Sequence, residues 1–245
     1  MNEIVGHPPT RTQHGFAAFL LKFMKSTPLI GGDMPSGVVR LLSSYSAAYL
    51  VPAGAGQFVL IDAGADANAE EILSVLKFKD ADASAIKAIF ITHGHIDHTS
   101  GLRNFPDADV YVGAGDRTYI EGTGNGDSIM AKLSGKKPKL AVPNLEKVHT
   151  INDDESVTVG SATIRALAVP GHTHGSMAYL VGSDLYIGDA VTFDVKGSAV
   201  KPPAPATYDM KLAIQSLDAL IKRLDQESVA VQAVVPNHSG PGTID

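Results

Sequence analysis

The chain contains no cysteine among its 245 residues. Disulfides and thiolate metal sites are therefore excluded, so any metal ion must be held by imidazole and carboxylate groups. A basic surface is also missing, because the formal net charge is −6 and the one lysine cluster falls at residues 136–139. Nucleic-acid partners normally require a basic patch, and we therefore predict no nucleic-acid binding.

Apolar runs long enough to cross a bilayer are absent as well. The early segment GFAAFLLKFM, Gly15–Met24, is too short for a span and includes Lys22. It has no small-residue cleavage site, so we predict a helix packed on the domain rather than an export signal. This favours a cytoplasmic protein without membrane contact, although an export signal already trimmed from the chain is the alternative.

The remaining composition is that of an ordinary globular protein. Hydrophobic residues make up 44% and charged residues 19% of the chain, which is long enough to bury a substantial core. We predict an N-terminal surface segment over residues 1–37 and a single domain over residues 38–245. Composition leaves the oligomeric state open, with a homodimer as one option.

Strand and helix patterns occur in two successive sets. Short apolar segments before residue 62, an amphipathic helix at 67–78 and the strand IKAIFIT at 86–92 form the first set. After an irregular region over 114–144, strands follow between 148 and 190, then an amphipathic helix at 207–224 and a strand at 229–240. Two such sets predict an α/β fold in which two sheets pack face to face with helices outside, a four-layer αββα sandwich.

A dense group of coordinating side chains follows the strand at 86–92. The stretch ITHGHIDHTSG carries His93, His95, Asp97 and His98 within six positions. Further along the chain, three more candidates each follow the C-terminal end of an apolar run: His172, Asp189 and His238. Because strand-end loops of an α/β protein converge on one site, these seven side chains predict a metal centre.

This ordered pattern resembles the metallo-β-lactamase superfamily, whose motif is H-x-H-x-D-H followed by a distant His, Asp and His. The surroundings PGHTHGS and YIGDA are similar too, and the resemblance covers residues 38–240. It implies the αββα fold and two divalent metal ions, with this ligand set: His93, His95 and His172 on the first ion, Asp97, His98 and His238 on the second, and Asp189 between them. Zinc suits such donors, with iron or manganese as alternatives. Asp62, in VLIDAG, is expected to orient a ligand from behind.

The resemblance also implies a reaction. A hydroxide that bridges two metal ions would cleave an ester-like bond of a small molecule, such as a lactone, thioester or β-lactam, and Asp97 would orient it as the catalytic carboxylate. No G-x-S-x-G motif offers a serine nucleophile instead. From their positions near the strand ends, we take as candidates for substrate contact His174, Phe193 and Tyr208, with Tyr119 and Lys196.

Several departures from the family pattern leave the substrate open. The glycine- and arginine-rich continuation of glyoxalase II is replaced by GDAVTFDVKGS, and Thr192 stands where quorum-sensing lactonases have a tyrosine. The alternative function is a mononuclear iron oxidoreductase similar to the persulfide dioxygenases, which would use His93, His172 and Asp189. The persulfide dioxygenases, too, have the glycine- and arginine-rich continuation that this chain lacks. A metal-binding partner protein without turnover is the third option.

Overall fold

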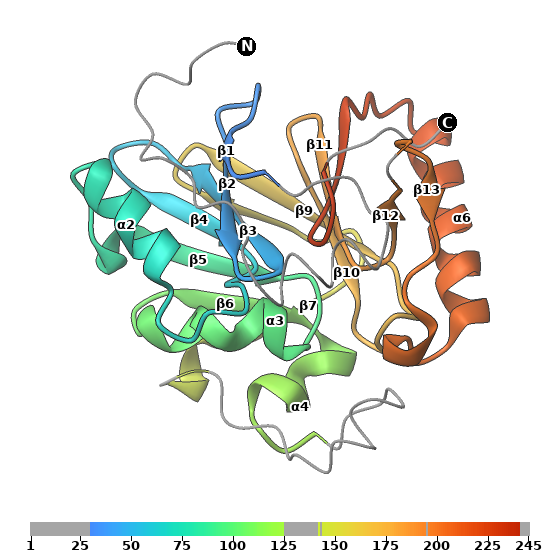
Figure 1. The fold of residues 1–245 in the computed structure, drawn as a ribbon, viewed down its shortest axis with the longest axis horizontal. Coiled ribbons are helices and arrows are strands. Elements are labelled where there is room, and N and C mark those ends of the chain that lie inside the picture. The colour runs from blue at the N-terminus through green and yellow to red at the C-terminus, as the bar shows by residue number, and fades with distance from the viewer. Residues whose placement is uncertain (1–29, 125–141, 143, 195, 241–245) are drawn as a thin grey trace.

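The computed structural model describes residues 30–124, 142, 144–194 and 196–240, and these residues form two β-sheets that face each other (Figure 1). The helix expected at residues 15–24 and most of the segment 1–37 lie outside the described residues, so the domain boundary at residue 38 stays a prediction. None of the described helices is long and apolar enough to cross a membrane.

The first sheet has seven strands in sequence order, from β1 to β7. Strands β1 to β4 pair antiparallel, whereas β4 to β7 pair parallel. Their bounds are β1 Gly32–Asp33, β2 Val39–Ser43, β3 Ser46–Pro52, β4 Phe58–Ile61, β5 Ile86–Ile91, β6 Asp109–Gly113 and β7 Val148–Ile151.

The second sheet has five strands in the order β14-β11-β10-β9-β8. Its strands are antiparallel except that β14 pairs parallel with β11. Their bounds are β8 Ser156–Val159, β9 Ala162–Ala168, β10 Met177–Val181, β11 Asp184–Gly188 and β14 Ala233–Pro236. A separate two-stranded hairpin joins β12 Thr192–Phe193 to β13 Ala199–Val200.

Two long helices cover the outer faces. Helix α2, Glu70–Phe78, buries an apolar face, and helix α6, Met210–Gln226, begins where the Asp209 side chain accepts a hydrogen bond from the Leu212 amide at 3.0 Å. Two single-turn helices are α3, Ile96–Thr99, and α4, Arg117–Ile120. Short 3₁₀ turns complete the described elements: η1 Ala83–Ala85, η2 Ser100–Asn104, η3 Ala114–Asp116, η4 Leu145–Lys147 and η5 Ala204–Ala206.

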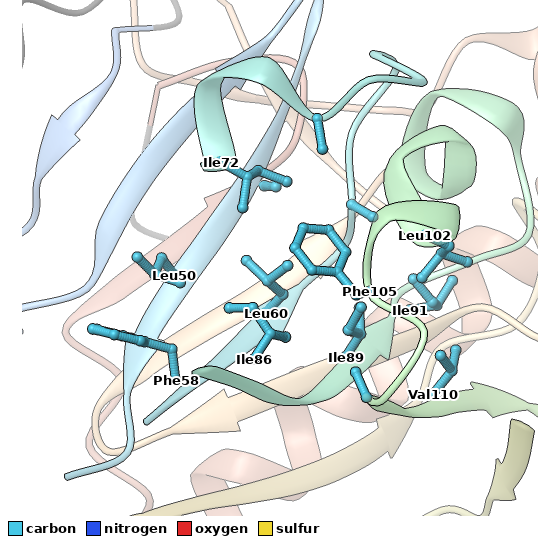
Figure 2. Close-up of a cluster of buried hydrophobic side chains, with 14 of the residues drawn as sticks. Leu50, Phe58, Leu60, Ile72, Ile86, Ile89, Ile91, Leu102, Phe105 and Val110 are labelled. Carbon is cyan, nitrogen blue, oxygen red and sulfur yellow. The ribbon is translucent and has the colours of Figure 1, made fainter. Parts of the chain in front are cut away.

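The buried apolar side chains divide into three clusters that define four layers. One cluster joins α2 to the outer face of the first sheet, as Ile72, Leu50 and Leu60 illustrate (Figure 2). A second lies between the sheets, where the Tyr49 and Tyr186 rings pack 4.9 Å apart. The third joins α6 to the outer face of the second sheet. The predicted αββα sandwich is therefore confirmed.

Three details differ from the sequence expectation. The last strand covers only Ala233–Pro236 rather than 229–240, because its pairing is limited to four residues beside β11. The region 114–144 is not irregular at its start, since η3 and α4 follow β6 directly. The pairs β1–β2 and β12–β13 are too short to leave a periodic pattern in the sequence.

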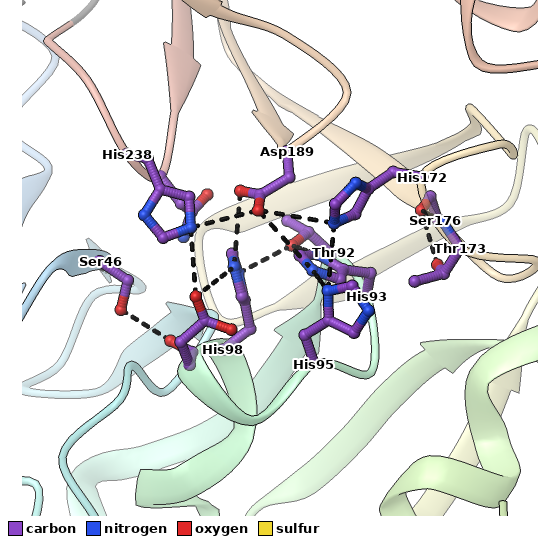
Figure 3. Close-up of polar contacts among 12 residues, drawn as sticks. Ser46, Thr92, His93, His95, His98, His172, Thr173, Ser176, Asp189 and His238 are labelled. Atoms are coloured by element: carbon purple, nitrogen blue, oxygen red, sulfur yellow. Dashed lines mark hydrogen bonds and ion pairs between the residues drawn. The ribbon is translucent and has the colours of Figure 1, made fainter. Parts of the chain in front are cut away.

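The topology brings four strand ends to one edge. Strands β9 and β11 both run antiparallel to β10, and β14 is parallel to β11, so these three strands end on the same side of the second sheet. The loop that follows β5 in the first sheet lies beside these strand ends. Figure 3 shows two of its side chains, His93 and His95, near His172 and Asp189. Residues nearly 150 positions apart in sequence therefore meet at this edge.

Candidate metal centre

Three histidines from two loops converge at this edge, and we call His93, His95 and His172 the trihistidine group. His93 and His95 follow β5, whereas His172 follows β9. The Nδ1 atom of His95 lies 2.9 Å from Nε2 of His93 and 3.1 Å from Nε2 of His172. One ring nitrogen from each of the three lies within 4.8 Å of the other two, which suits a single metal ion.

A second set, Asp97, His98 and His238, forms the carboxylate–histidine group. Asp97 and His98 belong to α3, and His238 follows β14. Nε2 of His238 lies 3.2 Å from Oδ2 of Asp97, and Nε2 of His98 lies 3.9 Å from the same oxygen. Their donor atoms also lie within 4.8 Å of one another, so this group could hold a second ion.

Asp189, which follows β11, lies between the two groups (Figure 3). Its Oδ2 atom is 3.6 Å from Nε2 of His172 and 3.1 Å from Nε2 of His238. Its Oδ1 atom is 3.5 Å from Nε2 of His98, and within the described part of the chain neither of these two buried atoms has a hydrogen-bond partner. Buried polar atoms normally form hydrogen bonds, so two such atoms that face each other without one fit a cation site.

Burial keeps the trihistidine group neutral. Burial lowers the pKa of His172 to about 3, and it holds the pKa of His93 well below its ordinary value, with the neighbouring imidazoles adding to the effect. The pKa of His95 is lowered for the same first reason. Neutral imidazole is the form that binds a metal, so this group needs no proton release at neutral pH.

The carboxylate–histidine group is ionised instead. Burial opposes charge on His238, but Asp189 and Asp97 outweigh it and raise the pKa of His238 to about 10. Burial also opposes charge on Asp97, yet His98 and His238 lower the pKa of Asp97 to about 2. Without a metal, protonated imidazoles thus balance the carboxylates, and a bound cation would replace those protons.

Asp62 lies behind this group and is fully buried. Its Oδ2 atom accepts hydrogen bonds from Nδ1 of His98 at 2.8 Å, from Oγ1 of Thr92 at 2.7 Å and from Nδ2 of Asn237 at 2.8 Å. Its Oδ1 atom accepts from the Thr92 amide at 2.8 Å. The neighbours of His93 and His238 are therefore tied to the carboxylate that orients His98, which agrees with the orienting contact expected of Asp62.

Sequence reasoning missed Tyr45, at the turn between β2 and β3. Its ring stacks on His238 with centroids 5.9 Å apart, and its carbonyl oxygen faces Nδ1 of His238 at 2.8 Å. Burial first, then the charges of Asp97 and Asp189, raise the pKa of Tyr45 to about 12. No motif in the sequence signals this residue, because a turn between antiparallel strands carries no metal-site pattern.

The candidates for substrate contact differ in their placement. The rings of His174 and Tyr208 lie 3.8 Å apart, and Tyr208 is 44% exposed. Tyr119 presents its ring edge-on to His95 at 6.4 Å. Phe193 differs from the expectation, because its side chain is fully buried in the cluster under α6 and is not exposed for contact. Lys196 lies on an exposed turn closed by Asp194.

Comparison with known proteins adds to this geometry. The sequence model of the metallo-beta-lactamase superfamily matches residues 44–227. A probable metallo-hydrolase, YflN, from Bacillus subtilis (strain 168) is 28% identical over 238 residues, which cover 87% of this chain and 88% of that protein. A hydroxyacylglutathione hydrolase from Shewanella sp. (strain ANA-3) is 30% identical over 117 residues, covering 48% of this chain but only 39% of that enzyme.

Solved structures agree on the fold. A B3 metallo-beta-lactamase with an active-site glutamic acid superposes with a TM-score of 0.66 at 21% identity, covering 97% of this chain and 90% of that one. The BLEG-1 B3 metallo-beta-lactamase gives a TM-score of 0.63 at 24% identity, covering 83% and 92%. At such identities the likeness establishes the fold alone. Because the family's sequence model matches most of the chain and the fold agrees with it, this protein belongs to the metallo-beta-lactamase superfamily.

Proposed function

We propose that the protein is a hydrolase that uses two divalent metal ions to cleave an ester-like bond in a small molecule. The observation that carries this proposal is the position of Asp189, whose carboxylate lies within 3.6 Å of donor atoms from both groups. A carboxylate shared by two ligand sets is the arrangement expected of a paired metal site.

The donor chemistry favours zinc. The trihistidine group offers three neutral imidazoles, and the second group adds a carboxylate of low pKa. Nitrogen and oxygen donors in this mixture suit zinc, with iron or manganese as alternatives because oxygen contributes. Nε2 of His98 and Oδ1 of Asp189, which have no hydrogen-bond partner within the described residues, are the local reason why a cation fits there.

When bound, such ions make water nucleophilic at neutral pH and polarise a substrate carbonyl. The chain itself supplies orientation. Asp97 is ionised, held by Nε2 of His238 at 3.2 Å, and its backbone carbonyl accepts a hydrogen bond from Oγ of Ser46 at 2.7 Å. We propose that this fixed carboxylate aligns the attacking water, which makes Asp97 the catalytic residue besides its coordinating role.

Lactones, thioesters and β-lactams are the substrate classes we propose. A relative named as a hydroxyacylglutathione hydrolase and structural neighbours named as beta-lactamases support this range without selecting within it. His174 and Tyr208 are the proposed substrate contacts, whereas Phe193, which is buried, is no longer among them. The net charge of −6 favours small molecules over nucleic acid. A cytoplasmic location and a homodimer stay predictions.

Elemental analysis combined with a substrate panel tests this proposal. We expect two zinc ions per chain and turnover of at least one lactone, thioester or β-lactam, but not of phosphodiesters. His172→Ala should abolish turnover, whereas His149→Ala, which removes a β7 histidine paired with Asp109 at the start of β6, should not. Two bound ions with no turnover on the panel would instead favour a metal-binding protein without activity.

One observation keeps the iron oxidoreductase as a second candidate. His93 and His172 lie 4.0 and 3.6 Å from the same oxygen of Asp189, so these three side chains could hold a single iron. That reading leaves Asp97, His98 and His238 without a role, which is why we rank it second. One iron per chain together with oxygen consumption would replace the hydrolase proposal.

A further inference from the structure

Asp116 is a fully buried carboxylate that the metal-ligand motif does not include. It ends η3, directly after β6, and β6 is the parallel neighbour of the strand that leads to His93. Its position therefore places a charged side chain between the strand ends of the first sheet and the loop after β9 in the second. A buried carboxylate requires hydrogen-bond donors, and the identity of these donors is informative.

Three donors reach Asp116, and all come from the two loops of the trihistidine group. Oδ2 accepts from the Gly94 amide at 2.7 Å and from Oγ1 of Thr173 at 2.7 Å. Oδ1 accepts from the Gly175 amide at 2.9 Å. Gly94 separates His93 from His95, and Thr173 is the residue after His172, so one carboxylate joins the backbones that carry all three histidines.

Close packing around these contacts leaves little room for adjustment. A Cβ atom on Gly94 would lie 2.6 Å from Cβ of Tyr119, and one on Gly175 would collide with the Asp116 amide. Thr173 is fixed further, because its amide donates to Oγ of Ser176 at 3.0 Å and its hydroxyl lies 2.7 Å from the same atom, as Figure 3 shows beside His172. Metal ligands must be held within about 0.5 Å of the productive geometry, and this junction provides such restraint.

We infer that Asp116 is a positioning residue that sets the spacing of the three histidines by clamping their two loops to each other. The inference rests on the proposed function only in that the histidines bind a metal, not in which bond is cleaved. Within the described part of the chain, Asp116 accepts no hydrogen bond from a side chain of the three histidines, so it acts through backbone placement. It therefore differs from Asp62, which holds the ring of His98 directly.

Asp116→Asn is the sharpest substitution. Both oxygens of a carboxylate accept hydrogen bonds, one from the backbone N–H of Gly94 and the other from that of Gly175. An asparagine side chain has an NH₂ group in place of one oxygen, so there a donor faces a donor. One loop is then released, although size and burial are preserved. Thr173→Val removes one of the three hydrogen bonds and serves as a milder second variant. Asp184→Asn is the matched control, since Asp184 is also buried but pairs with Ser36 at the opposite end of β11.

Zinc affinity, measured by chelator competition in two backgrounds, tests the inference without any substrate. In His238→Ala, where the trihistidine group is the intact one, Asp116→Asn should weaken zinc binding about 10- to 100-fold and Thr173→Val less. In His172→Ala, where the carboxylate–histidine group is intact, Asp116→Asn should change affinity less than about twofold, within the usual error of additivity. Asp184→Asn should change neither.

Three outcomes overturn the inference. Equal weakening in both backgrounds would reduce Asp116 to general stability, and unchanged affinity in both would remove its role. If neither background nor the unsubstituted chain binds zinc, the metal site and the inference fail together. A chain that binds two ions and shows the selective loss, yet hydrolyses nothing, sustains the inference while the proposed activity fails. A second readout, the visible spectrum of the Co²⁺-loaded His238→Ala chain, should change with Asp116→Asn because ligand geometry changes.

Discussion

The trihistidine group and the carboxylate–histidine group lie on either side of Asp189, yet they are held together by opposite means. Burial removes charge from the first, as the pKa of about 3 for His172 shows, whereas the second contains ion pairs that raise the pKa of His238 to about 10. Neutral imidazoles attract one another only through the hydrogen bonds that join His95 to His93 and His172, so the first group depends more on its scaffold. The second attracts its own members across 3.2–3.9 Å, and Asp189 adds ion pairs to two of them at 3.1 and 3.5 Å.

This difference explains why each group has its own buried aspartate. Asp116 contacts the backbone around the trihistidine group, where no ion pair between its three members holds the two loops together. Asp62 contacts the His98 ring itself, because the ring there must keep its Nδ1 proton and orientation. Substituting a residue that both groups share should weaken metal binding by both groups. Substituting a buried aspartate that supports one group should weaken metal binding mainly by that group.

The largest effect is expected for Asp189→Ala, because this substitution removes the carboxylate that lies beside both groups. Both ions should bind more weakly, and turnover should fall by more than the roughly 100-fold seen when only an orienting residue is lost. Metal content after dialysis and steady-state kinetics measure this, with Asp184→Asn as the control. A variant that retains two ions and activity would exclude Asp189 as a shared ligand.

A smaller effect, strongest at the carboxylate–histidine group because His98 is the ring that Asp62 contacts directly, is expected for Asp62→Asn. Asn tolerates the left-handed backbone at this position, φ 58°, so the fold should persist. The amide can no longer accept all the donors that converge on Oδ2, and His98 loses its orientation. Zinc affinity of the His172→Ala chain should fall about 10- to 100-fold by chelator competition. Asp66→Asn, which changes a capping contact nearby, is the control; a similar loss there would make the Asp62 effect non-specific.

The subtlest test is the titration of the metal-free protein. His172, with a depressed pKa, should stay neutral down to about pH 3, and its contribution to stability is lost as pH falls below its unfolded value of about 6.5. His238, with a raised pKa, should stay protonated up to about pH 10, and its contribution, fully present below about 6.5, is lost as pH rises. Imidazole ¹⁵N shifts measure both. Equal pKa values for the two rings would erase the contrast between the groups.

Much of the molecule could be predicted from the sequence because the signals are local. The periodicity of 67–78 and 207–224 gave the two covering helices, and the apolar run at 86–91 gave β5. His93, His95, Asp97 and His98 were found because their density has no ordinary explanation in a loop. The short strands β1, β12 and β13 were missed because two residues carry no period.

Asp116 could have been found by the same reasoning that found His172, since it too closely follows the end of an apolar strand. It was passed over because one carboxylate in GAGD has no partner visible in the sequence. Phe193 shows the opposite error, where proximity to Asp189 along the chain suggested substrate contact. Its side chain turns into the cluster under α6, since strand residues alternate between faces.

By itself, the sequence determined which donors exist: imidazoles and carboxylates without thiolates, placed at the ends of apolar strands. The family resemblance also implied how they divide between two groups. Only the tertiary structure decided which of them are charged and that Asp116 holds one group from behind. The physical reason is that residue type and local pattern are properties of the chain, whereas charge state depends on burial and on neighbours that the fold brings from distant positions.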